Sequence, residues 1–282
     1  MKKKKITKKQ RIRYIRAVIQ IIFFILSPAV FTTAFSGVKE ILKQFYNGEP
    51  IALSAFVTAL IVICLYTIVF GRFFCGYGCA FGTMGDAVYA LSSFVQKKTK
   101  KKLPKLSDKV ICLLQYVKYI VLVAVGAACV TGVYDNVMKG KNPWDVFSML
   151  TAGRFNLKGY EIGVGILLAV LVVMAWGERF FCQFLCPMGA VFSLLPVLPA
   201  VLYRRDRENC IPKCSACKKN CPVRMEIDGD SRKSGECIQC DGCAGICPKG
   251  NTRRAIRGIE GSEFVFLLLK MILLVVICWY FF

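Results

Sequence analysis

Apolar residues gather along the chain in five stretches, each long enough to cross a bilayer as a helix. These stretches run from Tyr14 to Phe35, Ile51 to Phe73, Val110 to Gly132, Ile162 to Phe181 and Phe264 to Phe282. The 56% content of apolar residues over 282 residues, and the mean hydropathy of +0.52, fit the same class. We therefore predict a mainly α, polytopic helical membrane protein.

Basic residues fall on one side of this topology. With the N-terminal run MKKKKITKKQRIR in the cytoplasm, the cytoplasmic segments and adjoining span ends carry 31 Lys and Arg, against 6 outside. This asymmetry predicts a multi-pass protein of the inner (cytoplasmic) membrane, with a cytoplasmic N-terminus and an outside C-terminus. The net charge of +22 then reflects topology and contact with the anionic lipid bilayer, and we expect no nucleic-acid partner.

An internal repeat divides the chain. Residues 72–82, RFFCGYGCAFG, align with residues 179–189, RFFCQFLCPMG, at a constant offset of 107 residues. Each copy follows an apolar stretch and leads into an amphipathic one, 83–96 and 190–201. We predict two helical hairpins related by a pseudo-two-fold axis. The outside loop 133–161 contains Asn142-Pro-Trp-Asp145, which predicts a short helix along the outer surface, with Trp144 at the membrane interface.

The predicted domains follow from these patterns. They are a basic cytoplasmic N-terminus (1–13), a first membrane hairpin (14–96), a basic linker (97–107), a second membrane hairpin (108–202), a cytoplasmic ferredoxin-like segment (203–261) and a C-terminal span (262–282).

Cysteine and histidine usage narrows the chemistry. The sixteen cysteines cluster beside cytoplasmic charge, where thiols stay reduced, which favours metal ligation over disulfides. Histidine is absent, which excludes bis-His haem, Rieske centres and His-bearing zinc sites. Any metal must rest largely on thiolate.

The strongest motif is the run from Cys237 to Pro248, with the spacing CxxCxxCxxxCP of 4Fe-4S ferredoxins. A second run, Cys210 to Pro222, differs by one extra residue in its first gap, which leaves open whether Cys210 supplies a ligand. In two-cluster ferredoxins the fourth cysteine serves the other cluster. We predict two 4Fe-4S clusters, one on Cys210, Cys214, Cys217 and Cys247, the other on Cys237, Cys240, Cys243 and Cys221. A pair of zinc knuckles is the alternative.

Each repeat contains a CxxxC pair, Cys75 with Cys79 and Cys182 with Cys186. On a helix, residues four apart share one face, so each pair could present two thiolates to a common point. The two pairs together could hold an additional iron-sulfur cluster, bridge electrons to quinone or form a redox dithiol. Alternatively, they are small residues in a tight helix crossing. Four cysteines lie alone in apolar stretches and are interpreted as packing residues: Cys64, Cys112, Cys129 and Cys278.

Three basic residues adjoin these motifs. Arg72 and Arg179 either offset the negative charge of a thiolate-bound cluster or anchor helix ends among lipid phosphates. Lys118 lies about 12 Å inside its stretch, taking 1.5 Å per residue. It either helps bind quinone or a cluster, or snorkels to the interface.

These motifs resemble the NapH and NosR type of membrane polyferredoxins, in which transmembrane helices carry two CxxxCP motifs at the cytoplasmic face and a two-cluster ferredoxin segment follows. The resemblance covers Ile51 to Pro248. It implies electron transfer between a quinol pool or cytoplasmic donor and a terminal reductase partner. Three features depart from the family: Ala80 replaces the proline, the large flavin domain of the NosR branch is missing, and a fifth span follows the ferredoxin segment.

We therefore expect a non-catalytic redox subunit. Its partners would be the quinone pool, a flavin or reductase subunit, and an acidic ferredoxin or flavodoxin, because residues 203–261 carry a net charge of +5. The alternatives are a catalytic quinol dehydrogenase subunit and a membrane iron-sulfur sensor or assembly scaffold. Copper reduction, as in the CcoG branch, is disfavoured by the lack of His.

Overall fold

The computed structural model describes residues 7–101, 104, 107–138, 140–154, 158–198, 203–205, 208–225, 234–254 and 263–281. Several predicted regions lie partly outside these residues: 1–6 of the basic N-terminus, 102–103 and 105–106 of the linker, 139 and 155–157 of the outside loop, 199–201 of the second amphipathic stretch, 206–207, 226–233 and 255–261 of the ferredoxin-like segment, and 262 and 282 of the C-terminal span.

The chain is mainly helical, as predicted. The first part contains α1 (Lys8–Leu26), α2 (Val30–Asn47), α3 (Ala55–Phe70), α4 (Phe73–Tyr77) and α5 (Ala80–Thr99). The second contains α6 (Asp108–Val130), the π-helix η1 (Tyr134–Met138), α7 (Pro143–Thr151), α8 (Glu161–Trp176), α9 (Phe180–Phe184) and α10 (Pro187–Leu194). The cysteine-rich segment contains β1 (Tyr203–Arg205), α11 (Ala216–Asn220), the 3₁₀ helix η3 (Ser234–Glu236), α12 (Gly242–Ile246) and β2 (Thr252–Arg254), and α13 (Glu263–Phe281) follows.

The first predicted span is not one straight helix. α1 ends at Leu26, and α2 continues at an angle of 63°. Pro28 explains the break, because it has no amide hydrogen to donate and disfavours helical geometry at Ser27. α2 then runs to Asn47, through residues expected to form an outside loop, and ends where Gly48 adopts a φ of +69°.

The other predicted spans correspond to helices of different lengths. Within the described residues, Lys109–Val130 is long and apolar enough to cross a membrane, and the bent pair α1 and α2 would be a second span if counted as one. The helices α3, α8 and α13 are apolar but shorter.

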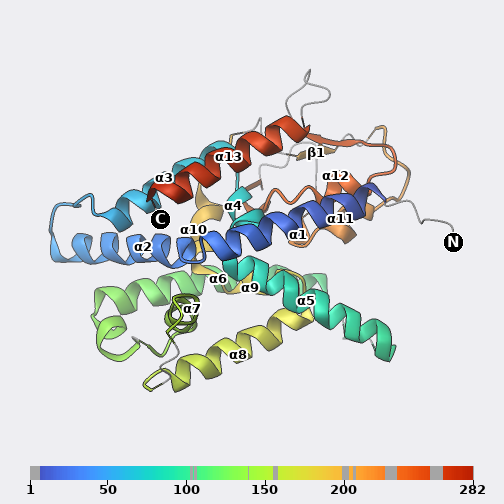
Figure 1. Cartoon of the computed structure of the whole chain (residues 1–282). Helices are drawn as coiled ribbons and strands as arrows, with labels where there is room; N and C mark the ends of the chain where they lie inside the picture. Colours follow the sequence, from blue (N-terminus) through green and yellow to red (C-terminus); the bar gives the residue numbers. More distant parts are fainter. Residues whose placement is uncertain are drawn as a thin grey trace.

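The helices pack as a bundle with the cysteine-rich segment at one end (Figure 1). α3 lies beside α13, α5 lies beside α8, and α1 contacts both α5 and α12. α7 and the far end of α2 lie away from the cysteine-rich segment. The strands β1 and β2 pair antiparallel, with Arg205 opposite Thr252, and so join the two ends of that segment.

The expected short helix in the loop 133–161 is present as α7. Asn142 caps it by accepting from the amide of Asp145 at 2.9 Å, and Pro143 occupies the first helical position. Trp144, however, does not lie on the surface of the protein. It is buried, and its ring centroid lies 5.5 Å from that of Phe35, because α7 packs between α2 and α8.

Candidate functional site

The two CxxxC motifs have the same local structure, but neither is one continuous helix. Cys75 lies in α4 and Cys79 caps α5 in an extended conformation, with a ψ of 120°. In the second copy Cys182 lies in α9, and Cys186 caps α10 with a ψ of 114°. Pro187 explains the second break, since the residue before a proline avoids helical geometry. The single-helix prediction is therefore wrong.

Matching hydrogen bonds close both breaks. In the first copy the amides of Gly78 and Cys79 both donate to the carbonyl of Phe74, at 2.8 and 2.9 Å. In the second copy the amides of Leu185 and Cys186 both donate to Phe181, at 2.9 Å each. The sequence repeat is thus a structural repeat, and it places one thiol of each pair at a helix N-terminus, where negative charge is favoured.

The structure gathers these four thiols, which we call the four-thiol site (Cys75, Cys79, Cys182 and Cys186). All four are buried, at 6–8% exposure. Burial and then the neighbouring thiols Cys182 and Cys75 raise the pKa of Cys79. Burial and the other three thiols likewise raise the pKa of Cys186, whose sulfur accepts from the amide of Gly189 at 3.2 Å. The thiols therefore act on one another across the two repeats.

Two buried arginines flank the four-thiol site and cross between the repeats. Arg72 and Arg179 are 1% and 2% exposed. A Cβ on Gly82 would overlap the guanidinium of Arg179, and one on Gly189 would lie 3.0 Å from Nη2 of Arg72. Each arginine thus fills space left by the glycine of the other repeat. Such burial leaves neither guanidinium free to anchor among lipid phosphates.

Each arginine also lies beside a thiol of its own repeat. Arg179 lies beside the Cys182 thiol and donates to the carbonyls of Cys75 and, at 3.2 Å, Gly76. Arg72 lies beside the Cys75 thiol, while among the described residues its buried Nε has no hydrogen-bond partner.

Two carboxylates balance these arginines, and they come from different parts of the chain. Asp86 of α5 accepts from Nε and Nη2 of Arg179 at 2.8 and 2.7 Å, and from Arg16 and Gln20 of α1. Burial opposes its ionisation, but Arg179 and Arg16 outweigh this and lower the pKa of Asp86. Glu236 of η3 bonds Arg72 at 3.1 Å and forms an ion pair with Lys118.

Lys118 therefore does not snorkel to solvent. It is 0% exposed, and its Nζ lies 5.0 Å from the ring centroid of Tyr119 as well as against Glu236. The residue joins α6 to the cysteine-rich segment. Its predicted quinone role stays a prediction.

The cysteine-rich segment has its own repeat, offset by 26 residues. The left-handed residues Lys213 (φ +58°) and Gln239 (φ +54°) each precede the second cysteine of their motif. The left-handed residues Arg224 (φ +52°) and Gly250 (φ +65°) each follow a Cys-Pro by two positions. Equivalent short helices, α11 and α12, lie between. The extra residue between Cys210 and Cys214 is thus accommodated before Lys213, without altering the rest of the loop.

Four cysteines of this segment form what we call the helix-facing site (Cys221, Cys237, Cys240 and Cys243). Burial and the neighbouring Cys240 raise the pKa of Cys221 to about 11, and burial raises that of Cys237 to about 12, with Cys240 and Cys221 adding to the shift. Cys237, Cys240 and Cys221 also add to the effect of burial on Cys243. These are the four cysteines that were assigned to one cluster from the sequence, with the fourth cysteine of the first motif, Cys221, serving the cluster of the second motif.

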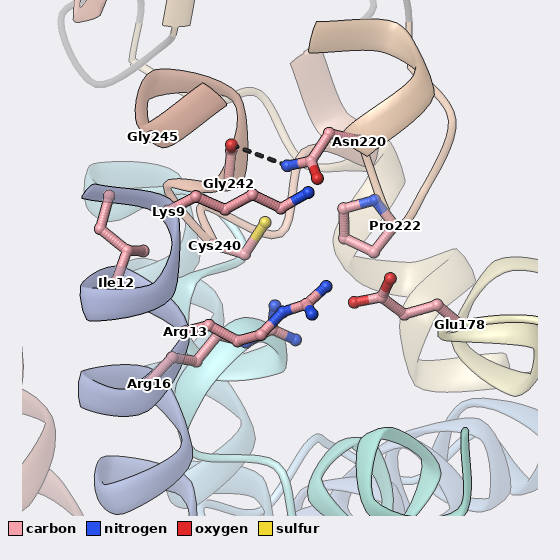
Figure 2. Close-up of a pocket in the computed structure, with 10 residues that line it drawn as sticks. All are labelled: Lys9, Ile12, Arg13, Arg16, Glu178, Asn220, Pro222, Cys240, Gly242 and Gly245. Carbon is pink, nitrogen blue, oxygen red and sulfur yellow. Dashed lines mark hydrogen bonds between the residues drawn. The ribbon is translucent and has the colours of Figure 1, made fainter. Parts of the chain in front are cut away.

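The helix-facing site borders a basic pocket (Figure 2). Lys9, Arg13 and Arg16 of α1 line one wall, and the sulfur of Cys240 points into the space between them and Pro222. The side chain of Asn220 donates to the carbonyl of Gly242 at 2.9 Å and so ties α11 to α12.

The remaining four cysteines are called the distal site (Cys210, Cys214, Cys217 and Cys247). Arg205 donates to the sulfur of Cys210 from Nη2 at 3.0 Å and to the carbonyl of Cys214 at 3.1 Å. The amide of Asn251 donates to the sulfur of Cys247 at 3.3 Å, and its side chain reaches the carbonyl of Asn209. The β1–β2 pair therefore brings Cys247 to the same end as Cys210.

Within the described residues, no three Cys, Asp or Glu side chains converge closely enough to hold a single metal ion. The four cysteines interpreted as packing residues lie apart from the three sites. Cys129 and Cys278 are buried, Cys64 is half-buried and Cys112 is exposed.

Comparison with known proteins identifies the family. A family model described as "4Fe-4S binding domain" matches residues 51–102 and 160–204, the segments that hold the four-thiol site. An uncharacterised protein of Methanocaldococcus jannaschii is 30% identical over 85% of this chain and 86% of its own. "Putative electron transport protein YccM" of Escherichia coli is 27% identical, over 77% of this chain and 60% of its own. "Ferredoxin-type protein NapH" of Escherichia coli is 22% identical, over 79% and 75%.

The chain belongs to the NapH/NosR-type polyferredoxin family. No solved structure matches it. The family model matches the two repeats and not the ferredoxin-like run from Cys210 to Pro248. In the sequence the CxxxC spacing of the repeats was weaker evidence for a cluster than the spacing of that run.

Sequence reasoning did not identify Asp86 or Glu236. These carboxylates lie 93 and 164 residues from the arginines they pair with, so no local spacing connects them. The sequence contained one weak indication, because Asp86 is a charged residue in the amphipathic stretch 83–96 that follows the first repeat.

Proposed function

We propose that this polyferredoxin is a membrane-bound iron-sulfur protein that passes single electrons between a donor and a redox partner. One observation carries the proposal: two repeated motifs gather four buried thiols beside two buried arginines, within the segments matched as a 4Fe-4S binding domain. A redox subunit of a larger oxidoreductase, rather than a stand-alone enzyme, is the role that this arrangement supports.

Charge balance supports a cluster at the four-thiol site. Among the described residues, four cations (Arg16, Arg72, Lys118 and Arg179) form ion pairs with two carboxylates, Asp86 and Glu236, and the half-buried carboxyl of Glu178 lies near Asp86, Arg16 and Arg179. A 4Fe-4S cluster on four thiolates carries two negative charges when oxidised, exchanges one electron, and would balance the excess. Two disulfides or four neutral thiols would leave this network with an excess of buried positive charge, which is costly. The redox-dithiol alternative is therefore the weaker one.

The cysteine-rich segment would hold two further 4Fe-4S clusters. The helix-facing site supplies Cys221, Cys237, Cys240 and Cys243, and the distal site supplies Cys210, Cys214, Cys217 and Cys247. Support comes from the matching backbone geometry of the two loops, from the amide of Asn251 that donates to Cys247, and from the mutual influence of the helix-facing thiols. As free thiols Cys221 and Cys237 are protonated at neutral pH, because burial raises their pKa values to about 11 and about 12, so cluster binding must release protons.

A membrane setting is part of the same proposal. The bent pair α1 and α2 would form the first crossing, and α3, α6, α8 and α13 the other four. The cysteine-rich segment and N-terminus would face the cytoplasm and the C-terminus the outside of an inner membrane. The long apolar helix α6 and the one-sided distribution of basic residues support this topology.

The proposed partners are an acidic ferredoxin or flavodoxin on the cytoplasmic side, the quinone pool, and a flavin or reductase subunit. The names of YccM and NapH, electron transport and ferredoxin-type, support redox partners in general. A quinone site at Lys118 receives less support, because its ammonium is already paired with Glu236.

Metal content tests the proposal. Protein purified without oxygen should contain about twelve irons and twelve acid-labile sulfides per chain, counting four per cubane. Replacing Cys75 and Cys182 together by Ala should lower this to about eight, whereas Cys112→Ala, at an exposed position of α6, should leave it unchanged. Eight irons in the unaltered protein would remove the cluster from the four-thiol site, and colourless protein loaded with zinc would refute the whole proposal.

A further inference from the structure

The helical part of the chain touches the cysteine-rich segment at η3 and at the loops of the helix-facing site. A Cβ on Gly76 would overlap the carbonyl oxygen of Ile238, and one on Gly71 would lie 3.1 Å from Nε2 of Gln239. The hydroxyl of Tyr77 donates to Asp241 at 3.1 Å, and Gln183 donates to the carbonyl of Pro222. Both repeats therefore contact the residues that flank Cys221, Cys237 and Cys240.

Equivalent positions in the two repeats make these contacts in different ways. Gly76 and Gln183 are related by the 107-residue offset, and each directly follows the first cysteine of its pair. Gly76 has no side chain and allows the backbone of Ile238 to touch it, whereas Gln183 reaches out to the backbone of Pro222. The first repeat has glycine at this position because its backbone touches the cysteine-rich segment directly, and the second repeat has glutamine because a side chain bridges a wider gap.

Gly76 cannot retreat from this contact. Its carbonyl accepts from Gln20 at 3.0 Å, from Arg179 at 3.2 Å and from Arg16 at 3.3 Å. Ile238 itself is 1% exposed and part of the core. A side chain at position 76 would therefore push the loop of Cys237 and Cys240 away from that of Cys75, because neither backbone can rotate aside.

The distal site is held differently. The contacts described for its cysteines come from Arg205 and Asn251, which belong to the cysteine-rich segment itself. Within the described residues, no hydrogen bond joins these cysteines to α1–α10.

We propose that Gly76 is a positioning residue that makes the four-thiol site and the helix-facing site immediate neighbours and leaves the distal site as the one presented to a soluble partner. This inference rests on the proposed function. It defines an order of sites: distal, then helix-facing, then four-thiol.

Magnetic coupling between reduced centres tests this order independently of turnover. In a variant lacking distal ligands, Cys214→Ala with Cys217→Ala, the EPR signals of the reduced protein should remain broadened by interaction between the two remaining centres. In a variant lacking helix-facing ligands, Cys240→Ala with Cys243→Ala, the signals should be those of isolated centres. Isolated signals in the first variant would overturn the order, even if the unaltered protein holds twelve irons and the proposed function stands.

The role of Gly76 has a matched control. Gly76→Ala and Gly37→Ala each place a Cβ over a backbone carbonyl, that of Ile238 and that of Phe56, but Gly37 lies in α2 against α3, away from the thiols. In the variant background that lacks the distal ligands, Gly76→Ala should weaken the magnetic interaction at unchanged iron content and Gly37→Ala should not. Equal spectra would refute the positioning role, and so would iron loss in both variants alike.

Discussion

Arg72 and Arg179 occupy equivalent positions in the two repeats, but their different surroundings predict unequal costs of substitution. Arg179→Gln removes two charge-assisted hydrogen bonds to Asp86, at 2.8 and 2.7 Å. The Asp86 side chain is only 18% exposed, so it loses its main counter-ion in a poorly solvated place. Breaking a buried ion pair costs about 3–5 kcal/mol. Because Asp86 keeps Arg16 and Gln20, we expect the lower limit, about 3 kcal/mol.

Arg72→Gln should cost less. It removes one bond of 3.1 Å to Glu236, whose side chain is 28% exposed and keeps Lys118 as a partner. Since Glu236 is partly exposed and keeps Lys118 as a counter-ion, the loss is that of one hydrogen bond, about 1 kcal/mol. Both substitutions remove one positive charge beside the thiols, so the effect of that charge on a bound cluster largely cancels in the comparison.

Thermal unfolding in detergent measures the difference. At about 3 °C per kcal/mol for a chain of this size, Arg179→Gln should lower the Tm by about 9 °C and Arg72→Gln by about 3 °C. Arg154→Gln, on an exposed residue after α7, provides a control that should stay within about 0.5 kcal/mol of the unaltered protein. An equal fall in Tm for the two variants, or a larger fall for Arg72→Gln, would refute the conclusion that Asp86 depends more on its arginine than Glu236 does.

Two further predictions concern the cysteine-rich segment. Burial raises the pKa of Cys237 to about 12, above its usual value of 9.0, so the unfolded chain loses this proton at a lower pH than the folded protein. The free energy of unfolding of cluster-free protein should therefore be highest below about pH 9 and fall by about 1 kcal/mol by pH 10. A Tm of the reduced apoprotein that is constant or rises over this range would contradict the prediction. Lys218→Glu with Lys219→Glu should slow reduction of the protein by an acidic ferredoxin at low salt. About 0.5 M salt should abolish this difference in rate, because screening removes electrostatic steering. An unchanged rate at low salt would exclude α11 as the docking face.

The sequence predicted the elements whose signals are local. The apolar stretch from Val110 to Gly132 appears as α6 almost residue for residue, and the repeat at a 107-residue offset predicted that four thiols could meet. The ferredoxin spacing also grouped Cys221 with Cys237, Cys240 and Cys243, because the exchange of the fourth ligand is a property of the motif itself.

Errors arose where a short-range feature overrides periodicity. The apolar pattern from Tyr14 to Phe35 continues through Pro28, but the backbone cannot, so one predicted span became two helices at 63°. The CxxxC pairs satisfy helical spacing, yet Cys79 and Cys186 are extended caps. Trp144 has the composition of an interfacial anchor, and only the packing of α7 against α2 shows that it is buried.

The two carboxylates show how the cysteine-rich segment completes the helical part. Asp86 follows the first repeat and neutralises Arg179, but the residue at the same 107-residue offset after the second repeat is Ser193, which cannot neutralise Arg72. Glu236 supplies the missing charge from the segment, and Tyr119 links it to Ser193 by hydrogen bonds of 3.5 and 2.9 Å. Without the segment, Arg72 and Lys118 would be left without the carboxylate they share. The segment is therefore not a tethered module: its η3 helix is part of the charge balance on which the four-thiol site depends.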